Sequence, residues 1–179
     1  MRLIGITYLL MFVILARFAS AADVTNADCR AERIAPITLS SKIQKDILRL
    51  TASGSPCIKG SIVVTIAKTN GKEIYKETLK TENLYIDPVG VPTSDIDKVL
   101  DRIIRDGSMT TGSWPPYVDK PQPIEVEGEY TYSVSKKEYD SLRKKNLPAF
   151  RLWLYSEVFT NLIYDDKNDS AVRIWEWGL

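Results

Sequence analysis

The first half of the chain carries an apolar pattern that predicts a β-hairpin. Residues 61–66 are rich in β-branched side chains, and residues 74–79 resume an extended pattern after a short polar stretch. Asn70-Gly71 lies in that stretch, and this dipeptide favours the type I′ turn that joins two antiparallel strands. We therefore expect two paired strands connected by a tight turn.

Apolar residues at helical spacing predict three helices. The first covers residues 41–50, which open on a capping-box pattern. The second lies within residues 94–107, where the apolar side chains form one stripe and a glycine marks the end. The third is short and runs from Ser135, another candidate cap, to about Asn146.

Alternation of polar and apolar residues predicts further strands towards the C-terminus. Residues 124–134 alternate, with Tyr130 and Tyr132 on one side and the glutamates on the other. Three more strands are expected at residues 150–155, 158–164 and 172–177. Because these strands cluster instead of alternating with helices, the sequence predicts an α+β fold: an antiparallel sheet of about five or six strands with two or three helices packed on one face.

The N-terminus has the three parts of a secretory signal peptide. Arg2 precedes an apolar run over residues 3–16, and small residues follow at positions 19–21. The run of about 14 residues is shorter than a helix that spans the bilayer core. We expect residues 1–21 to be cleaved, which leaves a single domain at 22–179 in the periplasm or outside the cell, with no integral membrane segment.

Export makes the two cysteines, Cys29 and Cys57, a predicted disulfide. Closing a loop of about 29 residues contributes roughly 3–4 kcal/mol in the chain-entropy model. A reactive thiol pair is disfavoured, since the chain has neither a CxxC motif nor a histidine. No metal site is expected, because two sulfurs leave a zinc site incomplete, and residues 165–170 suit a polar turn better than a calcium loop.

Composition and charge exclude several classes of function. The 179 residues contain 24 Lys+Arg, 23 Asp+Glu and no histidine. Such a balanced charge lacks the basic surface that non-specific nucleic-acid binding requires. Without histidine there is no Ser-His-Asp triad, no Cys-His pair and no imidazole general base. No nucleophile motif or phosphate-binding loop occurs either, so we expect a non-enzymatic protein without a cofactor.

The connection over residues 108–123 is the first candidate binding element. It contains four prolines, with Trp114 and Tyr117 beside the Pro115-Pro116 pair. Prolines reduce the entropy that a loop loses on binding, and Trp and Tyr commonly anchor interfaces. In the competing interpretation, the two rings fold back and cover an open edge of the core.

Three glutamates form the second candidate element. Glu125, Glu127 and Glu129 point the same way along the predicted strand. Such a row is typical of a solvated strand face that discourages edge pairing. It would also steer a basic partner, or supply the acid and base of a glycoside hydrolase.

The aromatic residues near the C-terminus form a third group. Trp153 shares a strand face with Tyr155, and Trp175 shares one with Trp177. A row left exposed would form a stacking platform for sugar or peptide ligands.

These patterns together predict an exported binding protein that is not an enzyme, such as an inhibitor or immunity protein directed at a cell-envelope hydrolase. We expect a protein partner and no nucleic acid. The predicted partner-binding residues are Trp114, Tyr117, Glu125, Glu127 and Glu129. Two alternatives remain open: a glycan hydrolase that uses a pair of carboxylates, and a structural envelope or assembly component with an available sheet edge.

Overall fold

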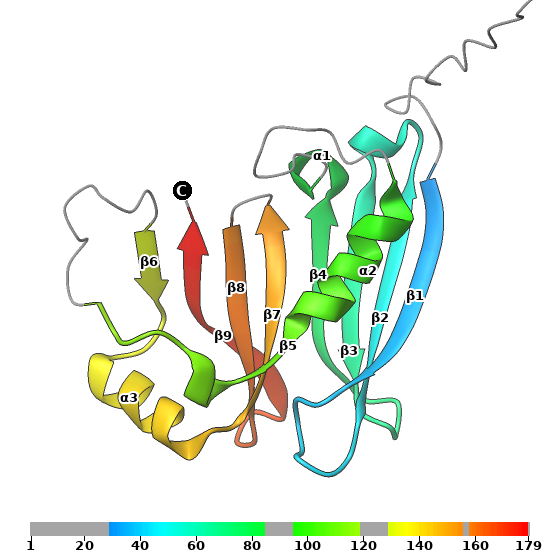
Figure 1. Cartoon of the computed structure of the whole chain (residues 1–179). Helices are drawn as coiled ribbons and strands as arrows, with labels where there is room; N and C mark the ends of the chain where they lie inside the picture. The colour runs from blue at the N-terminus through cyan, green and yellow to red at the C-terminus, as the bar shows by residue number, and fades with distance from the viewer. Residues whose placement is uncertain (1–28, 85–94, 119–128, 156–157, 179) are drawn as a thin grey trace, which may run out of the picture.

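The computed structural model describes residues 29–84, 95–118, 129–155 and 158–178 (Figure 1). This part of the chain contains two antiparallel sheets, of four and five strands, together with three α-helices. The α+β fold class is therefore confirmed, with the strands divided between two sheets.

The first sheet is a four-stranded meander in which each strand pairs with the next along the chain. Its strands are β1 (Cys29–Ile37), β2 (Asp46–Gly54), β3 (Ser61–Ala67) and β4 (Glu73–Lys80). The predicted hairpin is confirmed as β3 and β4. Buried and half-buried residues alternate along β3, so one face of this sheet is apolar and the other is accessible to solvent.

The helix predicted at residues 41–50 is wrong, because most of this segment belongs to the loop before β2 and to β2 itself. Ser41 Oγ does accept the backbone N–H of Gln44, but it caps a turn that no helix follows. Ile43, part of the supposed apolar stripe, has 90% of its surface exposed. From Asp46 onwards the burial alternates with a period of two, and pairing with β1 and β3 stabilises the strand.

The second sheet has the strand order β5-β7-β8-β9-β6. Its strands are β5 (Ser108–Thr110), β6 (Glu129–Tyr132), β7 (Pro148–Tyr155), β8 (Val158–Asp165) and β9 (Ser170–Gly178). The three C-terminal strands are confirmed. The predicted strand at 124–134 is represented by β6, while residues 124–128 lie outside the described residues.

Two of the three predicted helices are confirmed. The helices are α1 (Thr81–Leu84), α2 (Ile96–Gly107) and α3 (Lys136–Lys145), and two short 3-10 turns occur at η2 (Cys57–Lys59) and η3 (Thr111–Ser113). Asp95 caps α2 by accepting the backbone N–H of Asp97. Ser135 caps α3 as predicted, and Asn146 ends it at a left-handed φ of 47°.

The described residues build two apolar cores on opposite faces of the second sheet. The first core combines the apolar face of the first sheet, α2, and one face of β7 and β8. The second core lies on the other face of the second sheet, against α3 and the segment that contains Trp114. In Figure 1, α2 crosses the first sheet, whereas α3 lies beside the lower end of the second.

The predicted disulfide between Cys29 and Cys57 is confirmed. The two Cα atoms are 4.8 Å apart, and the bond joins the start of β1 to η2, the turn between β2 and β3. The predicted signal peptide at 1–21 lies outside the described residues, so cleavage and export stay predictions. Among the helices that the structure does describe, none has the length and hydropathy needed to cross a membrane.

Candidate functional site

Trp114, the first predicted contact residue, lies in the second core. Only 2% of its surface is exposed. Its ring stacks on Tyr139 with the centroids 5.4 Å apart, and it meets Trp175 edge-on at 6.1 Å. In this conformation Trp114 supports neighbouring residues and offers almost no surface of its own. A role for it in partner binding stays a prediction.

Tyr117 is half-buried and lies at the rim of the second core. It stacks on Tyr132 at a centroid distance of 4.1 Å, and Lys136 Nζ lies 5.2 Å from its ring centroid. The hydroxyl of Tyr132 accepts the backbone N–H of Val118 at 3.3 Å. Burial raises the pKa of Tyr132, which therefore stays a neutral phenol. These contacts hold Tyr117 and Val118, within the proline-rich connection, against β6.

The predicted acidic row is represented by Glu129, because Glu125 and Glu127 lie outside the described residues. Glu129 is exposed at the start of β6. Side chains alternate along a strand, so Glu129 projects from the face opposite to Tyr130 and Tyr132. The structure therefore does not bring Glu129 onto the same face of the sheet as Tyr117.

A row of aromatic residues crosses the second sheet. Directly opposed residues of neighbouring strands share a face, and the register joins Trp153 to Phe159, Phe159 to Trp177, and Trp177 to Tyr130. We call these four residues the aromatic row. All four are half-buried, and the row spans about 14 Å across four strands. The sequence indicated Trp153 and Trp177, but Phe159 and Tyr130 join them only through the strand pairing.

Two arginines cover rings of the aromatic row. The guanidinium of Arg151 lies 4.2 Å from the centroid of Phe159, and that of Arg102, from α2, lies 4.9 Å from the centroid of Trp153. Both distances are within cation–π range. The rings of Phe159 and Trp153 therefore hold two guanidinium groups in defined positions, one from β7 and one from α2.

Arg151 has no carboxylate within ion-pair distance among the described residues. The nearest acidic influence is Asp106, which already pairs with Arg102 at 3.7 Å and with Arg105 at 2.9 Å. Burial lowers the pKa of Arg151, although a guanidinium stays charged at neutral pH. Asp106 thus pairs with two guanidinium groups and acts on a third at longer range, so positive charge exceeds negative charge at this end of the aromatic row.

Asn161 lies beside Arg151 on the same face. The register places it directly opposite both Arg151 and Trp175, and none of its surface is exposed. Within the part of the chain described, its amide nitrogen and oxygen have no hydrogen-bond partner. The same holds for Arg151 Nε and for the indole nitrogens of Trp153 and Trp175. Buried polar groups are normally satisfied, so this concentration is unusual.

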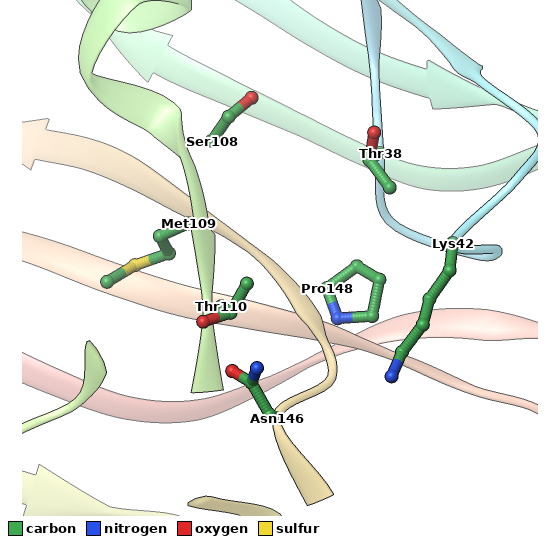
Figure 2. Close-up of a pocket in the computed structure, with 7 residues that line it drawn as sticks. All are labelled: Thr38, Lys42, Ser108, Met109, Thr110, Asn146 and Pro148. Carbon is green, nitrogen blue, oxygen red and sulfur yellow. The ribbon is translucent and has the colours of Figure 1, made fainter. Parts of the chain in front are cut away.

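Figure 2 shows a separate pocket of about 360 Å³. It lies between the β1–β2 loop, β5 and the start of β7, and in this view Pro148 stands between Lys42 and Asn146. Lys42 is its single charged lining residue among those described, and most of the remaining wall is apolar or hydroxyl-bearing. This lining could hold a small group but supplies no pair of catalytic carboxylates.

A cluster of charged side chains joins the two sheets at the β3–β4 and β8–β9 turns. Asp169 accepts hydrogen bonds from Lys68, Lys72 and Tyr164, and we call these four residues the inter-sheet ion cluster. The hydrogen bond from Lys68 is the main cause that lowers the pKa of Asp169, and Asp169 in turn raises the pKa of Lys68 to about 12. The cluster therefore has a structural explanation.

No group of three or more cysteine, aspartate or glutamate side chains suited to hold a metal ion occurs within the described ranges. No protein-family model matches the chain, and neither a curated protein nor a solved structure is significantly similar to it.

Proposed function

We propose that this protein is an exported, non-enzymatic binding protein, and that the aromatic row together with Arg151 forms its binding face. The observation that carries the proposal is the half-buried Arg151 guanidinium, which stacks on Phe159 and has no carboxylate partner in the described residues. A charge that is partly removed from water costs free energy unless it is paired. A bound partner would supply the missing counter-charge.

The residue types on this face favour a protein partner. Trp, Tyr and Arg are the residues most enriched at the energetic centres of protein interfaces. Here Trp153, Trp177 and Tyr130 lie in register beside two arginines, and the fold already holds their side chains in place. A face ordered in advance loses little conformational entropy on binding. An inhibitor or immunity protein directed at a cell-envelope hydrolase is the form of this function that we propose.

The test is capture of partners from an envelope extract of the source cell by the mature protein. Trp177→Ala removes half-buried aromatic area from the row, and Ile34→Ala removes apolar area from β1, where Ile34 is 52% exposed. We expect Trp177→Ala to lose the captured protein and Ile34→Ala to retain it. The captured protein should clear a peptidoglycan suspension, and added wild-type protein should suppress that clearance.

Two further variants ask whether the predicted contact residues belong to the same surface. We expect Tyr117→Ala to weaken capture, because Tyr117 borders Tyr132 at the edge of this face. We expect Glu129→Gln to leave capture unchanged, because Glu129 projects from the face of β6 opposite to the aromatic row. If Glu129→Gln abolished capture and Trp177→Ala did not, the binding surface would lie on the face of β6 that carries Glu129, and the proposal would be wrong.

A further inference from the structure

The position of the Arg151 guanidinium determines which of its donors a ligand can reach. Its central carbon, Cζ, lies over the Phe159 ring, 4.2 Å from the centroid. Its buried, unpartnered atom is Nε, so the terminal nitrogens carry the exposure that the half-buried side chain keeps. An arginine fixed in this way presents the edge of a planar fork, which matches the two oxygens of a carboxylate.

The surroundings of Arg151 favour an anion. Arg102 and Arg105 lie beside Asp106, the one carboxylate that acts on Arg151 in the described part of the chain. Within the described residues, Arg151 Nε and the indole nitrogen of Trp153 are buried donors without a hydrogen-bond partner. The terminal nitrogens of Arg151 are donors too, and they are the ones that an anion can reach.

The ring contacts favour an acidic side chain over a sugar. Arg102 lies over Trp153, while Phe159 has Arg151 against it and stacks with Trp177 at 5.6 Å. Arginine side chains therefore already cover a face of Trp153 and a face of Phe159, where a sugar would stack.

We infer that Arg151 is the receptor for a glutamate or aspartate side chain on an acidic segment of the partner protein. This inference rests on the binding function proposed above and names the chemistry of that face. The partner's carboxylate accepts two hydrogen bonds from the Arg151 fork, and its chain packs along Phe159 and Trp177. Arg102 and Arg105 supply additional attraction at longer range.

Nuclear magnetic resonance can test the inference without the natural partner. The probe is a terminally blocked tri-glutamate peptide, and the control is the matching tri-glutamine peptide. We expect tri-glutamate to shift the Nε–H signal of Arg151 and the indole N–H signal of Trp153 in a saturable way, and tri-glutamine to leave them in place. This wild-type comparison does not depend on any variant folding correctly.

Variants then localise the effect. Arg151→Lys keeps the charge but loses the planar fork, and we expect it to weaken tri-glutamate binding about tenfold. The matched control is Arg49→Lys in β2, where an exposed arginine pairs with Glu32 at 3.1 Å, and binding should be unaffected. Equal binding by Arg151→Lys and the wild type would overturn the bidentate site.

Other outcomes separate this inference from the proposed function. Tighter binding of tri-galacturonate than of tri-glutamate would overturn the inference in favour of an acidic glycan. Equal shifts with sulfate would overturn it in favour of a non-selective cationic surface. If capture requires Trp177 but tri-glutamate does not bind, the inference fails and the proposed function stands. If tri-glutamate binds but capture ignores Trp177, the carboxylate site stands and the proposed function fails.

Discussion

Asp46 at the start of β2 and Asn161 in β8 are both buried, yet their surroundings differ. Asp46 accepts hydrogen bonds from the backbone N–H groups of Leu39 and Ser40, at 3.1 and 2.7 Å, and from the Ser40 hydroxyl at 2.6 Å. Asn161 has no partner for either amide atom within the described residues. The first sheet thus satisfies its buried carboxylate, and the aromatic face of the second sheet leaves a buried amide unsatisfied.

The difference supports the proposed division of the fold, in which the first sheet serves stability and the second sheet serves recognition. In the first core, apolar residues alternate along β2 and β3 and pack beneath α2. Among the described residues, the face that carries the aromatic row instead concentrates donors without a hydrogen-bond partner, and its Arg151 guanidinium has no carboxylate within ion-pair distance. Local departures from good packing chemistry are expected at functional sites and are offset by stability elsewhere. This difference supports the proposal that the binding face lies on the second sheet.

The largest effect on stability is expected from substitution of Trp114. This variant distinguishes a residue that supports the aromatic row from one that contacts a partner directly. Trp114→Ala should lower the free energy of unfolding by about 3–5 kcal/mol, because it removes a fully packed indole from the second core. Urea denaturation measures the change. A loss below about 1 kcal/mol would mean that Trp114 is not a core residue and is free to bind.

The second-largest effect on stability is expected at Asp46, the buried carboxylate whose hydrogen bonds are satisfied. Asp46→Ala should destabilise the protein by about 3 kcal/mol, since it leaves the N–H groups of Leu39 and Ser40 buried or half-buried without their acceptor. The same denaturation experiment applies. Thr51→Ala, at an exposed position of the same strand, is the control and should change stability by less than about 0.5 kcal/mol.

At Asn161, in contrast, we expect a substitution to increase the stability of the protein. Asn161→Leu exchanges an unsatisfied buried amide for an apolar side chain of similar shape and should stabilise the protein by about 1–3 kcal/mol. We also expect Asn161→Leu to leave the first sheet unchanged, which a nuclear magnetic resonance spectrum of the backbone amides can confirm. A loss of stability would break the comparison with Asp46 and would mean that a buried water satisfies the amide.

The sequence predicts the parts of this molecule that local chemistry determines. The Asn70-Gly71 turn, the Ser135 cap and the C-terminal strands follow from residues close together in the chain. The prediction for residues 41–50 is wrong because two patterns overlap there. Ile43, Ile47 and Leu50 have the spacing of a helix, while the residues from Asp46 onwards also alternate as in a strand. Tertiary pairing with β1 and β3 decides the outcome there.

The candidate site is less predictable from sequence, because it too depends on how the strands pair. Trp153 and Trp177 stood out as aromatic residues, but the partners that complete the row depend on the register of four strands. Arg151 carried no signal of its own, since one arginine in an apolar strand resembles any snorkelling side chain. Its stacking on Phe159 and its lack of a carboxylate are properties of the folded sheet.

The smallest effect is expected from the inter-sheet ion cluster, whose charged groups are more exposed than the sites above. The pKa of Asp169 is lowered from its ordinary 3.8 by Lys68 and Lys72, so its contribution to stability is present above that value and is lost as the pH falls towards the folded pKa. The pKa of Lys68 is raised from 10.5 to about 12, so its contribution is lost as the pH rises through that interval. The stability difference between wild type and Asp169→Asn should therefore form a plateau between about pH 5 and pH 10 and shrink on both sides. Thermal unfolding from about pH 2 to pH 12 measures this difference. A difference that does not shrink as the pH falls from about 4 to about 2 would show that the carboxylate charge is not what joins the two sheets.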